Sequence, residues 1–185
     1  MNIKFKKNKG NKIFCIGNNK TGTTSLAKLF SDHNFDVANQ SEAEKLLNDY
    51  KSKNWSTIIK YCNKYEVFQD VPFSLPYTFI ILDHVFPNSK FVLSVRDNSE
   101  QWYNSIFNFH SKLFADGKNR ISKDDLRKAN YVYEGWILDL MKEVYGDFED
   151  VYNKERLKKI YDDNNNFIRN YFKNKDNFIS NNIHK

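Results

Sequence analysis

The sequence predicts an α/β fold whose central sheet is mostly parallel. Short unbroken apolar runs recur along the chain, which is typical of strands buried on both faces of a parallel sheet. Longer segments lie between them, and their apolar residues return every three or four positions, the period of a helix that packs by one face. Strands alternating with helices in this way form a parallel sheet covered by helices. The predicted strands comprise residues 12–17, 35–37, 66–71, 91–95 and 178–183.

The first predicted strand, residues 12–17, leads through a polar loop into a helix. Leu26, Leu29 and Phe30 supply the helical period, because they recur at three- and four-residue spacing. Residues 23–25 are two threonines and a serine, whose hydroxyl groups suit the unpaired N–H groups at the start of a helix. This segment therefore reads as strand, polar loop and helix in succession.

The later elements follow the same logic. Ser41 and Glu44 form a capping-box pattern, which predicts a helix beginning there. Pro72 closes the strand of residues 66–71, and Pro87 stops a helix over residues 76–86 because proline cannot continue either element. Further helices are predicted over residues 55–62, 99–114, 122–144 and 152–172.

Length and charge bound the organisation of the chain. It has 185 residues, close to the size of one domain, and a net charge of +6. Five lysines and no acidic residue lie among the first twelve positions, so most of the excess charge is local. We therefore predict a basic N-terminal arm over residues 1–11, a single domain over residues 12–185, and no nucleic-acid partner.

The cysteine count and the hydropathy pattern suggest the compartment. Cys15 and Cys62 are too few for a disulfide framework, and no Cys-x-x-Cys or His/Cys cluster has the spacing of metal ligands. No apolar run reaches the roughly 18 residues of a membrane span, and the lysine-rich start lacks the apolar stretch of a signal peptide. The expectation is a soluble cytoplasmic protein that holds no metal.

The loop after the first strand has the composition of an anion site. Lys20 supplies a cation, Gly22 permits close backbone approach, and Thr23, Thr24 and Ser25 supply hydroxyl donors at a helix N-terminus. An ordinary polar turn is the alternative. The Walker A pattern does not fit, because its lysine follows the second glycine, whereas here lysine precedes Gly22 by two residues.

Two segments resemble the sulfotransferase family. Residues 20–24, Lys-Thr-Gly-Thr-Thr, match every position of that family's 5′-phosphosulfate loop, written K-[ST]-G-T-[ST]. The strand of residues 91–95 runs into Arg96, and Ser105 follows in the next helix, like the arginine and serine that hold the cofactor 3′-phosphate in the family. The family spacing is more often eight residues than nine, so Asn104 is the alternative to Ser105.

The resemblance implies a three-layer, P-loop-NTPase-like sulfotransferase fold. It also implies transfer of a sulfuryl group from 3′-phosphoadenosine 5′-phosphosulfate (PAPS) to a hydroxyl or amine, leaving 3′-phosphoadenosine 5′-phosphate (PAP). The implied catalytic residues are Lys20, which neutralises the leaving phosphate, and Asp70, the base, with a histidine as the alternative base. The implied cofactor-binding residues are Asn19, Lys20, Thr21, Gly22, Thr23, Thr24, Ser25, Arg96 and Ser105.

The sequence leaves the function, the acceptor and the oligomeric state open. A PAP-binding module without catalysis and a nucleotide-dependent kinase-like P-loop enzyme are the alternative functions. The acceptor pocket is expected from loops and helices such as residues 45–64 and 111–134, whose composition fits a glycan, a small alcohol, a lipid headgroup or a peptide equally well. Trp102 and residues 131–136 are expected in the core or the wall of the acceptor pocket, and the sequence does not determine the oligomeric state.

Overall fold

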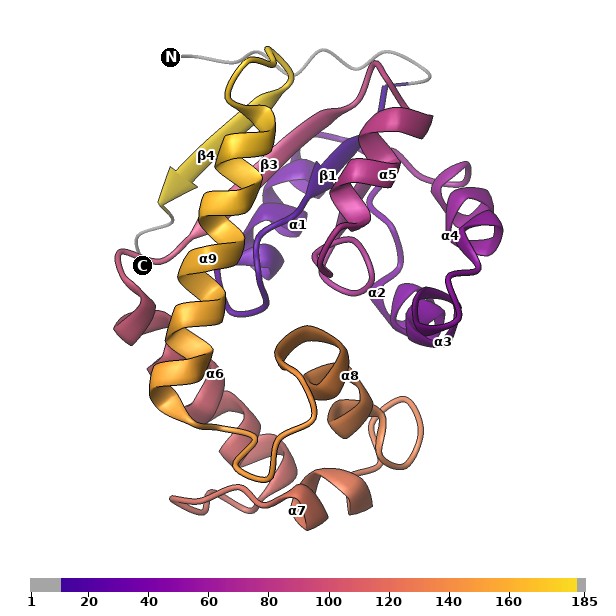
Figure 1. The fold of residues 1–185 in the computed structure, drawn as a ribbon. Coiled ribbons are helices and arrows are strands. Elements are labelled where there is room, and N and C mark those ends of the chain that lie inside the picture. The colour runs from indigo at the N-terminus through magenta and orange to yellow at the C-terminus, as the bar shows by residue number, and fades with distance from the viewer. Residues whose placement is uncertain (1–10, 183–185) are drawn as a thin grey trace.

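The computed structural model describes residues 11–182, and nearly all of the predicted basic arm falls outside that range. Four strands form one parallel sheet in the order β2-β1-β3-β4 (Figure 1). The prediction of an α/β fold with a parallel sheet is confirmed. The strands are β1 (Ile13–Cys15), β2 (Val67–Gln69), β3 (Lys90–Val95) and β4 (Phe178–Asn182).

The register of the sheet places the ends of β1 and β2 side by side, and β3 continues beyond them to Val95. Cys15 of β1 pairs with Gln69 of β2 on one side and with Val92 of β3 on the other. Because all strands run in the same direction, the loops that follow them leave from one edge of the sheet. The predicted site residues on the loops after β1, β2 and β3 therefore start from neighbouring positions.

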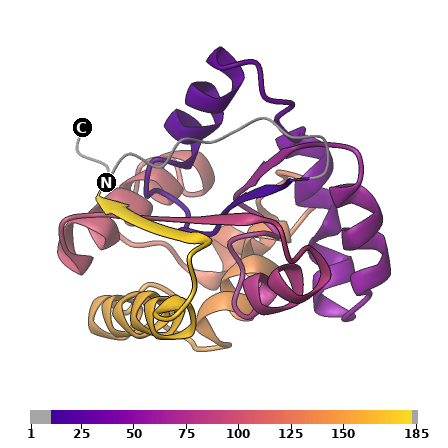
Figure 2. The same cartoon turned by 90° about the horizontal axis from the view of Figure 1, so that it is seen from above.

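Helices cover both faces of the sheet, so the structure has three layers. Ile13 and Cys15 pack on one face with Phe30 of α1, whereas Phe14 packs on the other face. Figure 2 shows α1 on one side of the sheet and α5 and α9 on the opposite side. Alternate side chains of one strand thus serve two cores, which explains why the strands read as continuous apolar runs.

The face opposite α1 is rich in aromatic rings. Phe14 stacks on Phe68 with ring centroids 5.0 Å apart and on Phe91 at 5.5 Å. Phe172 of α9 lies 4.9 Å from Phe91, which joins the helix to the sheet. Burying one such side chain contributes about 1.5 to 3 kcal/mol, so this layer supplies much of the stability of the fold.

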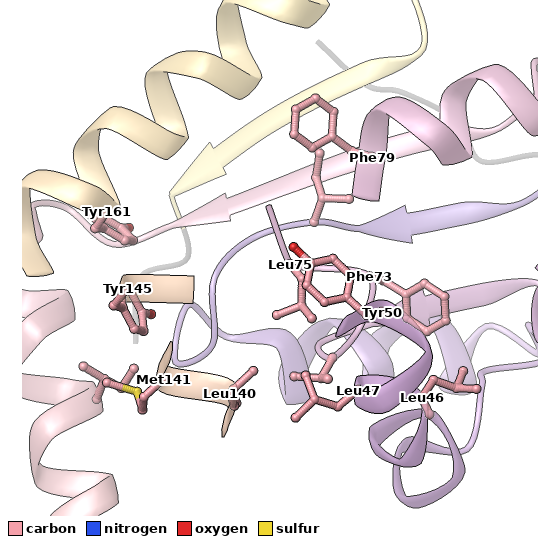
Figure 3. Packing of buried hydrophobic residues seen from close by; sticks show 14 of the residues in the cluster. Leu46, Leu47, Tyr50, Phe73, Leu75, Phe79, Leu140, Met141, Tyr145 and Tyr161 are labelled. Carbon is pink, nitrogen blue, oxygen red and sulfur yellow. The ribbon is translucent and has the colours of Figure 1, made fainter. Parts of the chain in front are cut away.

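A group of helices lies beyond the carboxyl edge of the sheet (Figure 1). Figure 3 shows that Leu140 and Met141 of α8 belong to the same buried cluster as Leu47 of α3 and Leu75. These helices therefore share a core with the sheet. The helices are α1 (Thr23–Asp32), α2 (Gln40–Ala43), the 3-10 turn η1 (Glu44–Leu46), α3 (Leu47–Lys51), α4 (Trp55–Cys62), α5 (Thr78–Val85), α6 (Ser99–Phe114), α7 (Lys123–Lys128), α8 (Trp136–Tyr145) and α9 (Lys154–Phe172).

Two local predictions between α1 and β2 were wrong. Residues 35–37 do not form a strand, and only Val37 makes an isolated parallel bridge, to Val67. The capping box of Ser41 and Glu44 does not form either. Asn39 caps α2 instead, because its side chain accepts the N–H of Glu42. An asparagine two positions earlier thus satisfies the helix start.

The predicted helix over residues 122–144 is two helices. Ser122 and Asp125 form a capping box at the start of α7, which ends at Ala129 in extended backbone. Gly135 has φ of 82° and begins α8. A residue in the left-handed region cannot continue a right-handed helix, so the helix must break at Gly135. The apolar residues keep a helical period on both sides of the break, and the sequence pattern therefore did not reveal it.

Candidate functional site

A cavity of about 310 Å³ lies at the carboxyl edge of the sheet. It brings together Lys20 from the loop after β1, Asp70 from the end of β2 and Arg96 from the end of β3. Three polar residues that are far apart in sequence therefore line one space. The other predicted site residues that line it are Asn19, Gly22, Thr23, Thr24 and Ser25.

The loop is held against β3 by packing that only glycine permits at position 17. A Cβ atom on Gly17 would lie 2.3 Å from the carbonyl oxygen of Ser94. The hydroxyl of Thr21 is fully buried, donates to the carbonyl of Asn18 at 2.6 Å and lies 2.8 Å from Oγ of Ser94. Thr21 therefore attaches the loop to β3 through its hydrogen bonds, and it does not line the cavity.

Trp102 supports the same loop from α6. Its indole Nε1 donates to the carbonyl of Asn19 at 3.1 Å, and its ring stacks on Tyr161 with centroids 4.4 Å apart. The side chain is fully buried, as expected for a core residue. One tryptophan therefore connects the loop, α6 and α9.

The start of α1 presents an anion-binding end to the cavity. Gly22 is its N-cap, with φ of 91°, and no side chain caps the helix there. The first turn itself contains no acidic residue, although the Asp70 carboxylate from the end of β2 accepts a hydrogen bond from Thr23. Lys20 adds a full charge, and its ammonium lies 3.7 Å from the centre of the Phe109 ring.

Arg96 is positioned by two hydrogen bonds. Its Nε donates to the carbonyl of Lys20 at 2.7 Å, and its backbone N–H donates to the hydroxyl of Tyr161 at 2.9 Å. The two predicted anion motifs are thus in direct contact. Ser105 is half-buried on α6 outside the cavity, and the alternative, Asn104, is exposed and donates to Glu100 at 3.4 Å. Neither of these two residues joins Arg96 in the cavity.

Asp70 has the electrostatics of a proton acceptor near neutral pH. Burial raises its pKa to about 6, and the nearby charge of Glu44 acts in the same direction. Hydrogen bonds from the backbone of Val71, at 2.9 Å, and from Thr23 oppose this rise, as does the charge of Lys20. Asp70 and Lys20 both have left-handed backbone, with φ of 61° and 70°, a strained conformation that recurs in functional loops.

His110, the histidine whose helix lines the cavity, is a poor proton acceptor. It is buried, and its Nδ1 lies 2.7 Å from the hydroxyl of Tyr152. Burial, together with the nearby charge of Lys20, lowers the pKa of His110 to about 3. The imidazole therefore stays neutral near pH 7, whereas Asp70 is largely ionised.

Comparison with protein families identifies the chain. The family model described as the sulfotransferase domain matches residues 12–184. The chain belongs to the sulfotransferase family. Comparison with curated proteins finds no match. The cavity of this sulfotransferase holds both segments on which the sequence resemblance depended, the loop with Lys20 and the strand end at Arg96.

Part of the wall of the sulfotransferase cavity was not predicted from the sequence. Gln69 precedes Asp70 directly, and that adjacency was the one available signal. Glu44 was interpreted as a capping residue, and its exposure to the cavity depends on how α2 and η1 pack. The unpredicted polar and aromatic residues that line the cavity are Gln40, Glu44, Gln69 and Phe109, while Phe114, Tyr131 and Trp136 lie in segments expected in the core or the pocket wall.

Within residues 11–182, no group of three or more histidine, cysteine, aspartate or glutamate side chains has the geometry of a metal site. Over the same described part of the sulfotransferase, no helix is both long and apolar enough to cross a membrane.

Proposed function

We propose that this sulfotransferase takes its sulfuryl group from PAPS and transfers it to a hydroxyl or amine of an acceptor. The observation that carries the proposal is the meeting of Lys20, Asp70 and Arg96 in one cavity from three strand ends. Two of these residues are cations suited to phosphate groups, and the third is a carboxylate able to take a proton. An enzyme that transfers an anionic group to a protonated acceptor needs both kinds of group.

The donor half of the cavity has the chemistry of a bisphosphate site. Lys20 and the N-terminus of α1 would hold the 5′-phosphosulfate, since both concentrate positive charge at the same place. Arg96 would hold the 3′-phosphate, because it lines the cavity and the hydrogen bond from its Nε to the carbonyl of Lys20 holds the guanidinium beside the phosphate loop. The fit supports PAPS as the donor in preference to a nucleotide without a 3′-phosphate.

Asp70 would act on the acceptor. PAPS supplies the sulfur, to which the acceptor oxygen or nitrogen bonds as the bond from sulfur to the 5′-phosphate oxygen breaks. The acceptor proton passes to Asp70, which is largely a carboxylate above its pKa of about 6. Lys20 stabilises the charge that develops on the leaving phosphate oxygen, as cations do in phosphoryl transfer.

Calorimetric titration with PAP tests the donor site, with ADP and 5′-AMP as the ligands lacking the 3′-phosphate. We expect PAP to bind more tightly than ADP or 5′-AMP. Arg96→Ala should lower the affinity for PAP by about ten- to hundredfold, because losing an ionic hydrogen bond costs about 1.5 to 3 kcal/mol. Exposed Arg120 lies outside the cavity, so Arg120→Ala is the matched control and should bind PAP like the parent.

The outcomes separate the competing functions. Equal affinity for PAP and ADP would indicate a kinase-like nucleotide enzyme, and unchanged PAP binding in Arg96→Ala would refute the 3′-phosphate assignment. Lys20→Ala should abolish sulfuryl transfer from PAPS. Tight PAP binding by the parent without transfer to a glycan, small alcohol, lipid headgroup or peptide would instead support a module that binds without catalysis.

A further inference from the structure

Three aromatic side chains from α6, α8 and the segment between α7 and α8 line the cavity. Phe114 ends α6, Tyr131 lies between α7 and α8, and Trp136 begins α8. The rings of Phe114 and Tyr131 are 5.9 Å apart and nearly perpendicular, and those of Tyr131 and Trp136 are 5.3 Å apart. Three rings from separate segments thus surround one side of the cavity, an arrangement that suits a cation because ring faces carry partial negative charge.

Glu44 lies against the same rings and is held at both ends. The hydroxyl of Tyr131 donates to its carboxylate Oε1 at 3.2 Å, and Nε1 of Trp136 donates to its backbone carbonyl at 3.2 Å. Glu44 is half-buried and lines the cavity. Aromatic rings that position a carboxylate give a site where a bound cation gains from both kinds of group.

Gln69 provides an independent indication of a ligand. Its side chain is only 8% exposed and lines the cavity, and its Nε2 donates to Oε1 of Gln40 at 2.8 Å. Its own Oε1 is buried and accepts no hydrogen bond from any residue in the described range. A buried acceptor without a donor is costly, so a ligand carrying an N–H or O–H group would satisfy it.

The cavity contains charges of both signs. Among the described residues that line it, the cations are Lys20 and Arg96, both assigned to the donor. The rings of Tyr131 and Trp136 instead lie against the carboxylate-bearing Glu44, and the Asp70 carboxylate lies near both Glu44 and Lys20. A ligand that complements Glu44 and these rings carries positive charge and hydrogen-bond donors. The volume of about 310 Å³ covers the donor half of the cavity as well, so the space beside a bound donor suits only a small acceptor.

We propose that the acceptor is a small amino alcohol whose ammonium group binds between Glu44 and the rings of Tyr131 and Trp136. Its hydroxyl then points toward Asp70 and is the group that receives the sulfuryl. This inference rests on the proposed transfer from PAPS and specifies the acceptor. The site should therefore bind a charged acceptor more tightly than a neutral acceptor of the same shape, because the Glu44 carboxylate and the aromatic rings attract the positive charge.

Choline and 3,3-dimethylbutan-1-ol test the proposal, because they have the same shape and hydroxyl but only choline is charged. Binding of each to the full chain is measured by calorimetry or ligand-detected NMR, with PAP and without it. We expect choline to bind at least about tenfold more tightly than the neutral alcohol, in line with a desolvated cation–π contact beside a carboxylate. Equal binding of the two probes by the parent protein would overturn the proposal.

Glu44→Gln should abolish the preference for choline while leaving the neutral alcohol unchanged. Glu42→Gln is the matched control, since Glu42 is exposed, lies two residues away and does not line the cavity. A preference that persists in Glu44→Gln, or disappears equally in Glu42→Gln, would overturn the assignment to Glu44. PAP affinity is recorded in the same samples, so failure of the donor site is distinguished from failure of the acceptor assignment.

Discussion

Replacement of Asp70 by asparagine should lower activity and raise stability together. As the base, Asp70 should contribute about 10² to 10⁴ in rate, the usual range for general base catalysis. Asparagine has nearly the same shape and keeps an oxygen that can accept the N–H of Val71, which now bonds to Oδ1 of Asp70 at 2.9 Å. The activity loss should therefore reflect the missing proton acceptor.

The pH dependence gives the first readout. The Asp70 carboxylate has a pKa of about 6, so kcat/KM of the parent should rise about tenfold per pH unit below that value and level off above it. The residual activity of Asp70→Asn should lack this rising limb. Sulfuryl transfer measured between about pH 5 and pH 8 with PAPS and a reactive acceptor tests the expectation.

Stability gives the second readout. The pKa of Asp70 rises from 3.8 to about 6 on folding, and each unit corresponds to about 1.4 kcal/mol. The folded protein thus binds this proton more tightly than the unfolded chain, so the contribution of Asp70 to stability falls as pH rises from about 4 to about 6. Above that window Asp70→Asn should be more stable than the parent by at most about 3 kcal/mol, and below it the gain should vanish.

Denaturant unfolding at about pH 4 and pH 8 measures that difference, with exposed Asp162→Asn as the control carboxylate. The reasoning is refuted if Asp70→Asn retains full activity with the rising limb intact. It is equally refuted if the variant is less stable than the parent at the higher pH, because the carboxylate would then be a stabilising group.

Three other substitutions have defined outcomes. Gly17→Ala should lower the free energy of unfolding by about 1 to 3 kcal/mol, because its Cβ would lie 2.3 Å from the carbonyl oxygen of Ser94, and an unchanged melting temperature would contradict this. Trp102→Phe leaves the carbonyl of Asn19 without its donor, so thermal melts and PAP titrations should both show losses, of about 1 to 3 kcal/mol in stability. Ser105→Ala should keep PAP affinity within about twofold, since Ser105 lies outside the cavity; a tenfold loss would show that α6 contributes to the 3′-phosphate site.

The elements that the sequence predicted well are those whose signals are local. The strand before Gly17, the loop through Thr24 and the helix after it follow one another directly, so composition and order sufficed. The strand that ends at Arg96 was predicted for the same reason. A run of buried apolar residues and the polar residue that ends it are adjacent in the chain, and no distant partner is needed to recognise them.

The sequence pattern gave the wrong secondary structure at two places, residues 122–144 and residues 35–37. The period of residues 122–144 remains helical throughout, although the extended backbone at Ala129 and the left-handed Gly135 divide it. Val37 has a strand-like neighbourhood but pairs with Val67 at one position only. In each case the packing of surrounding elements determined the backbone, and propensity is too weak to override it.

By itself the sequence predicted the parallel sheet, the loop that we propose binds phosphate, and the candidate roles of Lys20, Asp70 and Arg96. Only the tertiary structure decided that Glu44 and Trp136 share a cavity with them, that Thr21 fastens the loop, and that His110 is too deeply buried to accept a proton readily. The physical reason is that burial and electrostatic environment depend on neighbours from every element packed against a side chain. Residues 44 and 136 are far apart in sequence, and only folding brings them into contact.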